Sequence, residues 1–260
     1  MMTTNVDVPP RAGWSVGDRQ GGVGKERAGD GWSHAVEIGP SLLAADPLAY
    51  GAAIDDVATA DYLHVDVMDG HFAHDLSWGP GMVRMFVRRS RIPVEVHLMV
   101  DEPQLWVEPY AAAGARRLVL HVESLPEAAL CSVLALVHEL GCEVVLALAP
   151  GTRPALSETV LQLIDGVMIM GVVPGQGGSG MLPDTARRVA AMSMLLIARG
   201  LEGRVSIAVD GGVNVDNIGN LADAGASRFV VGTGVYRSAN RERRIAELRR
   251  SAAARVTAVG

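Results

Sequence analysis

Imidazole and carboxylate side chains are concentrated in one short stretch of the sequence, HVDVMDGHFAHD, residues 64–75. His64 and Asp66 are two residues apart, so they would project from the same face of an extended strand. His97 and Asp210 end two other apolar runs further along the chain. Buried groups of these types need a partner or a metal ion. Converging on one point, they would suit one divalent ion, such as Zn, Mn, Fe or Co.

The elements that must position these residues are eight short apolar runs separated by longer amphipathic stretches. The runs are residues 36–43, 61–68, 94–100, 117–123, 143–149, 166–172, 204–211 and 227–234. Apolar strands that are each followed by a helix indicate a parallel sheet covered by helices. Eight such units in about 220 residues predict an α/β fold, a (β/α)8 TIM barrel in a single domain. The turn after the first run is PSLLAAD rather than G-x-G-x-x-G, which disfavours a dinucleotide-binding sheet.

The N-terminal region has a different texture. Residues 1–34 are rich in glycine and charge and show no hydrophobic periodicity, so they are predicted to be a disordered extension. The barrel domain is then residues 35–260. In the first interval between runs, Asp46 and Pro47 have the types expected of an N-cap and a first-turn residue, predicting a helical stretch over 46–60.

Active sites of such barrels lie at the C-terminal ends of the strands, where His64, Asp66, His97 and Asp210 are all predicted to lie. His121 lies near the end of the run 117–123, but a single histidine there is better explained as a hydrogen-bonded core residue. Other polar residues of the opening stretch come after its strand. Asp69 is predicted to shape the turn, and His71, His74 and Asp75 fall on the loop, where they can be solvated.

Glycines form a second group at strand ends, in residues 172–180, 210–212 and 232–234. Such turns either bind phosphate through backbone N–H groups or are ordinary tight turns. Lys25 is the only lysine, so an anion would be bound mainly by backbone amides. Its place in the N-terminal stretch also disfavours Schiff-base chemistry, which needs a lysine amine in the site. Three methionines at strand ends, Met68, Met99 and Met170, are equally consistent with core filling and with apolar cover over a reacting carbon.

The bulk composition limits the classes of partner and the location. A net charge of −6 argues against binding to nucleic acid or an anionic membrane. No apolar run is long enough to span a bilayer, and the N-terminus lacks the apolar stretch of a secretory signal. Cys131 and Cys142 resemble buried thiols of a reducing compartment rather than a disulfide framework. A cytoplasmic location is therefore expected.

Several motifs together resemble the ribulose-phosphate 3-epimerase family. They are PSLLAAD, HVDVMDGHF, VEVHLMV, a proline–glycine–x–glycine–glycine loop after the sixth run, and VDGGV. The similarity extends from about Ile38 to Tyr236. HxDxMDGxF, HLM and VDGG in this order and spacing are a specific combination.

The resemblance implies a metal-dependent isomerase acting on carbohydrates, a homo-oligomer of the pentose phosphate pathway. It would interconvert D-ribulose 5-phosphate and D-xylulose 5-phosphate by two-base proton transfer at carbon 3, through an ene-diolate bound to one divalent ion. His64, Asp66, His97 and Asp210 match the metal ligands, and the two aspartates also match the catalytic acid/base pair. The matching substrate-binding residues are Ser41, Met68, Met99, Met170, Gly177, Gly178, Gly211, Gly212, Gly232 and Thr233.

The loop after the sixth run departs from the family pattern. The family usually has PGFGGQ there, whereas this chain has PGQGGSGM. The residues that differ from the usual ones are Val173, Gln176, Ser179 and Met181. The sugar therefore stays open between ribulose 5-phosphate, another ketose phosphate such as allulose 6-phosphate, and an unphosphorylated ketose. A non-catalytic barrel is a further alternative, against which the retention of all four ligand positions argues.

Overall fold

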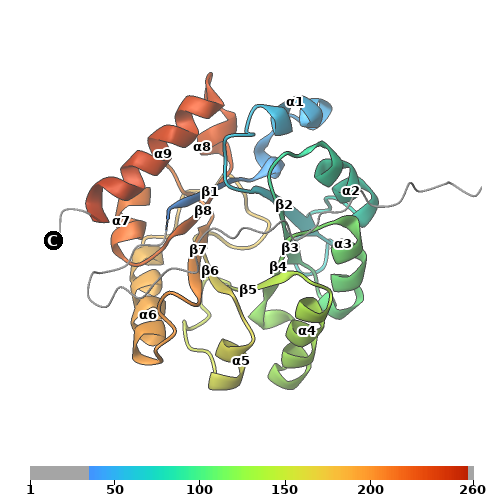
Figure 1. Cartoon of the computed structure of the whole chain (residues 1–260), viewed down its shortest axis with the longest axis vertical. Coiled ribbons are helices and arrows are strands. Elements are labelled where there is room, and N and C mark those ends of the chain that lie inside the picture. The colour runs from blue at the N-terminus through green and yellow to red at the C-terminus, as the bar shows by residue number, and fades with distance from the viewer. Residues whose placement is uncertain (1–34, 257–260) are drawn as a thin grey trace, which may run out of the picture. The chain divides into compact units, whose positions relative to one another are not determined.

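The computed structural model describes residues 35–256, which form a barrel of eight parallel strands surrounded by helices (Figure 1). The strands are β1 (Glu37–Pro40), β2 (Leu63–Met68), β3 (Val94–Met99), β4 (Arg117–His121), β5 (Glu143–Leu148), β6 (Gly166–Met170), β7 (Ser206–Asp210) and β8 (Arg228–Val231). Each falls within one predicted run, so the predicted (β/α)8 barrel is confirmed. The predicted extension, residues 1–34, lies outside the described residues.

The α-helices follow the strands and cover the outside of the barrel (Figure 1). They are α1 (Tyr50–Asp55), α2 (Pro80–Arg89), α3 (Val107–Ala113), α4 (Glu127–Glu139), α5 (Glu158–Gln162), α6 (Thr185–Ala198), α7 (Ile218–Asp223), α8 (Thr233–Tyr236) and α9 (Arg241–Val256). Short 3-10 helices are η1 (Leu42–Ala44), η2 (Pro47–Ala49), η3 (Pro103–Leu105) and η4 (Val122–Ser124). No helix in the described range is both long and apolar enough to cross a membrane.

The first helical interval is broken rather than continuous. Asp46 caps η2 as predicted, accepting a hydrogen bond of 2.9 Å from the Leu48 N–H, with Pro47 in the first turn. The chain then forms α1 and ends in turns, so residues 47–55 of the predicted helical stretch 46–60 are helical and the remainder is not. Gly51 stands in the first turn of α1, where glycine weakens a helix.

The strand order is β1-β8-β7-β6-β5-β4-β3-β2, and every pairing is parallel. The seam between β1 and β2 is joined by a bridge between Ser41 and His64. Below it, the Asp61 N–H donates to the carbonyl of Ile38, and the Asp61 carboxylate accepts from the Ile38 N–H. The sheet thus closes on itself, which brings strands distant in sequence to one rim.

Strand β5 shows why the apolar runs are continuous. Val144, Leu146 and Leu148 face the helices and belong to the large outer core, whereas Val145 and Ala147 lie in a separate cluster inside the barrel. Both faces of the strand are buried, so both sets of alternating positions are apolar. The helices therefore pack on the outer core, and the site residues lie at the rim above the cluster inside the barrel.

The floor of the barrel interior is polar and ion-paired. Glu95 accepts hydrogen bonds from Arg228 (2.6 Å) and Arg117 (3.2 Å), and Arg228 also pairs with Glu37 (3.0 Å). The two guanidinium groups lie over the ring of Tyr62. Because Glu95 also contacts His64, this network forms a rigid base beneath the rim.

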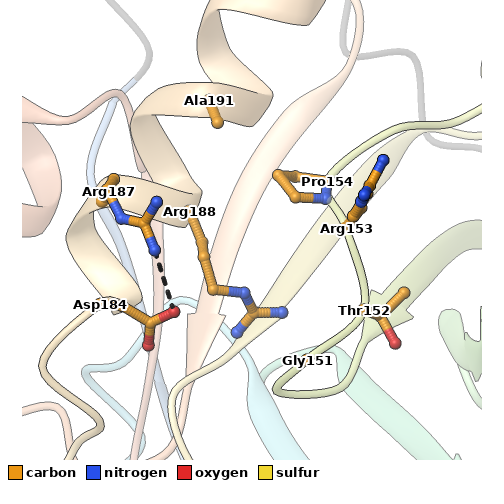
Figure 2. A pocket seen from close by; sticks show the side chains of 8 residues that line it. All are labelled: Gly151, Thr152, Arg153, Pro154, Asp184, Arg187, Arg188 and Ala191. Atoms are coloured by element: carbon orange, nitrogen blue, oxygen red, sulfur yellow. Dashed lines mark ion pairs between the residues drawn. The ribbon is translucent and has the colours of Figure 1, made fainter.

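Helix α6 is tied to the barrel rim by a buried arginine. Arg188 donates to the carbonyl oxygens of Met170 (2.7 Å), Leu148 (3.1 Å) and Ala149 (2.6 Å), which end β6 and β5. Figure 2 shows its guanidinium between α6 and the 151–154 loop, beside a surface cavity of about 250 Å³. This clamp fixes the position of the loop after β5.

Candidate active site

The four predicted ligand residues meet at the C-terminal rim of the barrel. His64 and Asp66 extend from β2, His97 from β3, and Asp210 from the last position of β7. One potential ligand atom from each residue lies within 4.8 Å of the other three. His64, Asp66 and His97 are buried, whereas the Asp210 side chain is 14% exposed. The arrangement that the sequence predicted is therefore present, with Asp210 nearest to solvent.

The two histidines face the carboxylates with different ring nitrogens. Nε2 of His64 lies 3.2 Å from Asp66 and 3.8 Å from Asp210, and Nδ1 of His97 lies 3.3 and 3.5 Å from the same two residues. Nδ1 of His97 is buried and has no hydrogen-bond partner in the described part of the chain. A buried imidazole nitrogen without a partner, facing two carboxylates, fits a divalent cation as the shared partner.

The other nitrogen of each ring contacts a buried side chain outside the cluster. Nδ1 of His64 lies 2.8 Å from Oε1 of Glu95, and a hydrogen on this nitrogen leaves Nε2 free to bind a metal ion. Nε2 of His97 lies 2.9 Å from Nε2 of His121. The ring orientations are therefore set by buried partners outside the cluster.

Charges within the cluster shift the pKa values of its members. Burial opposes protonation of His64, but Asp66, Glu95 and Asp210 outweigh it and raise the pKa of His64 well above its usual value. Burial also opposes ionisation of Asp66, yet His64 and His97 hold the pKa of its carboxyl well below its usual range. The metal-free site thus favours protonated imidazoles beside an ionised carboxylate, and a metal cation can replace that positive charge.

Glu95 contacts the cluster through His64 and is a residue that the sequence reasoning missed. It is 1% exposed, and although burial opposes its ionisation, Arg228, His64 and Arg117 hold the pKa of Glu95 well below its usual value. The available signal was an acidic residue inside the apolar run VEVHLMV. Its partners could not be inferred, because Arg228 is 133 positions away in the sequence.

The predicted substrate-lining residues are also at this rim. The Ser41 hydroxyl donates a hydrogen bond of 2.7 Å to Oδ2 of Asp66. Met68 and Met99 pack in one cluster with Ala73, and Met170 belongs to the interior cluster of the barrel. All three methionines are buried, which is consistent both with core filling and with apolar cover over a reacting carbon. Contact with substrate therefore stays a prediction.

The loop between β6 and α6 lies across neighbouring loops. A Cβ atom added to Gly175 would lie 3.0 Å from Cβ of Ala73 and 3.7 Å from Sδ of Met68. Similarly placed atoms on Gly177 and Gly178 would lie 3.6 Å from Leu43 and 4.0 Å from Thr233. Residues 175–178 therefore lie close to the segments that follow β1, β2 and β8.

The glycines after β7 are required by close packing. Gly211 and Gly212 have φ angles of 103° and 72°, which favour glycine. A Cβ on Gly211 would lie 2.6 Å from Val172, and one on Gly212 would lie 2.5 Å from the backbone of Met181. Gly232 is likewise close to Ala44. These contacts explain the glycines as tight turns, and phosphate binding at them stays a prediction.

The remaining polar residues of the opening stretch are separate from the cluster. Asp69 accepts hydrogen bonds from the N–H groups of His71 and Phe72, which confirms its role in shaping the turn. His71, His74 and Asp75 are exposed on the loop. His121 is buried and bonded, as predicted for a core histidine, and its partners are His97 and Glu123.

Comparisons with known proteins identify the family of this chain. Residues 37–236 match the model of the ribulose-phosphate 3 epimerase family. The ribulose-phosphate 3-epimerase of Mycobacterium leprae is 38% identical over 222 residues, 84% of this chain and 95% of that protein. The Bacillus subtilis protein of the same name is 34% identical over 218 residues, 83% of this chain and 99% of that protein.

Solved structures support the same architecture at lower identity. KGPDC from Streptococcus mutans superposes with a TM-score of 0.62 at 11% identity, covering 84% of this chain and 98% of that one. A 3-hexulose-6-phosphate synthase superposes with a TM-score of 0.58 at 18% identity, covering 84% of this chain and 100% of that one. At these identities the likeness shows the barrel fold alone. The family match and the identities to its curated members show that this chain belongs to the ribulose-phosphate 3-epimerase family of isomerases.

Proposed function

We propose that this protein is a metal-dependent epimerase that interconverts D-ribulose 5-phosphate and D-xylulose 5-phosphate. The observation that carries the proposal is the cluster of His64, Asp66, His97 and Asp210, three of them buried, in a chain of this family. The curated relatives compared above are named for the same reaction. The assignment of individual residues to roles is part of the proposal.

Inversion at carbon 3 by proton transfer requires two acid/base groups, and the site offers two carboxylates. A proton must leave one face of the carbon and another must arrive on the opposite face, which a single base cannot reach. Asp66 extends from β2 and Asp210 from β7, strands that are not neighbours in the sheet. In the proposed mechanism one aspartate removes the carbon 3 proton, and the other, protonated, delivers a proton to the opposite face. Their roles exchange in the reverse direction.

Residues of this chain would hold both the metal ion and the reacting carbon. One divalent ion bound by the four-residue cluster would supply positive charge that stabilises the negative charge developing on the substrate oxygens. Ser41 orients Asp66 through its hydrogen bond. The buried Met68, Met99 and Met170 would form an apolar wall that excludes water from the carbanion. Two nitrogen and two oxygen donors suit Zn, Mn, Fe or Co.

The substrate phosphate is proposed to bind at the glycine turns, mainly through backbone N–H groups. The residues are Gly177, Gly178, Gly211, Gly212, Gly232 and Thr233. Support comes from the proximity of Gly178 to Thr233, which brings the loop after β6 to the turn after β8. Exposed backbone amides in such turns form a natural anion-binding surface.

A second candidate substrate is allulose 6-phosphate, and an unphosphorylated ketose is a third. The observation that favours them is the loop after β6, which lies close to the segments that follow β1, β2 and β8 and carries Val173, Gln176 and Ser179 in place of the usual family residues. The loop after β6, rather than the metal ligands, would distinguish a longer sugar from ribulose 5-phosphate.

Turnover of a substrate panel by the metal-loaded, full-length protein tests the function. D-ribulose 5-phosphate, D-allulose 6-phosphate and free D-ribulose would be followed by proton NMR, with and without a chelator. We expect the highest kcat/KM for ribulose 5-phosphate and its loss on metal removal. A tenfold preference for allulose 6-phosphate would transfer the proposal to that sugar, and no turnover of any ketose would refute it.

We also propose a homo-oligomer located in the cytoplasm. Several large apolar side chains are exposed on η2, η3, α2 and the adjoining loops: Leu48, Leu76, Met82, Met85, Leu105 and Trp106. Their burial between subunits would remove apolar surface from water. Free thiols at Cys131 and Cys142 suit a reducing compartment. Light scattering after gel filtration tests the oligomeric state, and a monomer would contradict the proposal. Cell fractionation tests the location, and a secreted protein would contradict it.

A further inference from the structure

We propose that His121 and Glu123 form a hydrogen-bonded relay that fixes the tautomer and ring orientation of His97, and thus position a metal ligand. The inference rests on the metal site proposed above. Nε2 of His97 lies 2.9 Å from Nε2 of His121, and Nδ1 of His121 lies 3.1 Å from Oε2 of Glu123. The planes of the two rings differ by 16°, and their centroids lie 5.1 Å apart.

The direction of the relay follows from what each group can donate. Nδ1 of His97 faces Asp66 and Asp210, so it must be free of hydrogen to bind an ion there. The ring hydrogen of His97 is then on Nε2 and is donated to His121. A neutral His121 that accepts at Nε2 carries its own hydrogen on Nδ1 and donates it to Glu123. An ionised carboxylate can only accept, and Glu123 therefore fixes the order of donors and acceptors.

The relay is held rigidly at both ends. His121 is fully buried, and its ring packs against Phe72 at a centroid distance of 4.7 Å. Glu123 accepts a hydrogen bond of 2.9 Å from the Ala149 N–H and another from the Thr152 hydroxyl. Figure 2 shows Thr152 in the loop after β5, beside the buried Arg188 that anchors this loop. The position of His97 thus depends on β3, β4 and the loop after β5.

The other metal ligand of this type, His64, is oriented by a carboxylate directly. Its distal nitrogen contacts the carboxylate of Glu95 directly, whereas that of His97 reaches a carboxylate only through a second imidazole. Each histidine therefore has an acidic residue that orients the proton of its distal nitrogen. The competing explanation makes His121 a core residue that is satisfied by Glu123 alone and has no influence on His97.

Three variants of the full-length protein separate the two explanations. Glu123→Gln removes the charge that ends the relay, and His121→Phe removes the acceptor while retaining an aromatic ring. Glu127→Gln is the matched control, because Glu127 lies at the start of the next helix and accepts a hydrogen bond from Ser157, remote from the imidazoles. The dissociation constant for Zn²⁺ would be measured by competition with a chelating dye, and thermal unfolding would be measured on the metal-free proteins.

We expect Zn²⁺ to bind about ten- to hundredfold more weakly to Glu123→Gln and His121→Phe, and with unchanged affinity to the control. Loss of thermal stability in either variant with unchanged Zn²⁺ affinity would overturn the relay and leave a structural role. Wild-type protein provides an independent test if a variant does not fold. Nitrogen-15 NMR of the Zn²⁺-loaded enzyme should find His97 protonated at Nε2 and His121 at Nδ1; any other pair of tautomers would refute the proposal.

Failure of the relay and failure of the proposed function give different results. Active wild-type protein with unchanged Zn²⁺ affinity in both variants refutes the relay alone. Protein that binds Zn²⁺ through the relayed histidine but turns over no ketose refutes the epimerase function alone.

Discussion

Oδ2 of Asp66 accepts a hydrogen bond of 2.7 Å from the hydroxyl of Ser41, across the seam where the barrel closes. Residues from the first and second βα units thus fix the orientation of one proposed base before substrate binds. The other oxygen of Asp66 faces both histidines, so each carboxylate oxygen has a separate task.

Replacing Ser41 by alanine should lower kcat. A hydrogen bond to a charged group contributes about 1.5–3 kcal/mol, so its loss should reduce kcat by roughly ten- to hundredfold if the bond orients Asp66 for proton transfer. Steady-state kinetics with the metal-saturated variant would measure this. A wild-type kcat would show that Ser41 does not support the base.

Replacing Glu95 by glutamine should destabilise the protein strongly. The variant removes the buried carboxylate that pairs with Arg228, and breaking a buried ion pair in this way costs about 3–5 kcal/mol. Urea unfolding of the metal-free protein would measure the change. Glu37→Gln is the control, because Glu37 pairs with the same arginine but its side chain is 39% exposed, and its loss should cost less than about 1 kcal/mol. Equal losses would contradict the central role of Glu95.

Replacing Gly175 by alanine should raise KM, because the new Cβ would lie 3.0 Å from Ala73 in the segment that follows β2. Gly175 also has a φ angle of 82°, which costs an alanine about 1 kcal/mol. Gly141→Ala is the matched control, since Gly141 has a φ angle of 77° and no atom within 4 Å of the added Cβ. Both variants should lose similar stability, and only Gly175→Ala should raise KM, by about tenfold. An unchanged KM would show that the loop does not act on substrate.

Metal binding should release protons at neutral pH. The pKa values of His64 and His97 are raised in the metal-free site because Asp66 and Asp210 outweigh the opposing effect of burial. Both imidazoles therefore stay protonated at pH values above the pKa of a histidine in the unfolded chain, and a bound ion must displace these protons. Apparent Zn²⁺ affinity should rise with pH, and calorimetry in buffers of different ionisation enthalpy should find about one to two protons released. Binding without proton release at pH 7 would contradict this state of the site.

The strands of the fold could be predicted because burial on both faces leaves long apolar runs, as in β5. The same regularity predicted which strand ends would carry His64, Asp66, His97 and Asp210. The supporting contacts could not be predicted. Glu95 meets Arg228 only because the barrel closes, and His121 differs from an ordinary core histidine only in its distance from His97. Such contacts depend on three-dimensional register, which one sequence does not specify.

The central claim is that Asp66 and Asp210 act on opposite faces of carbon 3. It is tested most directly by incubating D-ribulose 5-phosphate in deuterium oxide with the wild type, Asp66→Asn and Asp210→Asn, each with its metal content measured. We predict that the wild type forms xylulose 5-phosphate with deuterium at carbon 3, and that neither variant inverts the carbon even when loaded with metal. Inversion at the wild-type rate by either metal-loaded variant would contradict the two-base account.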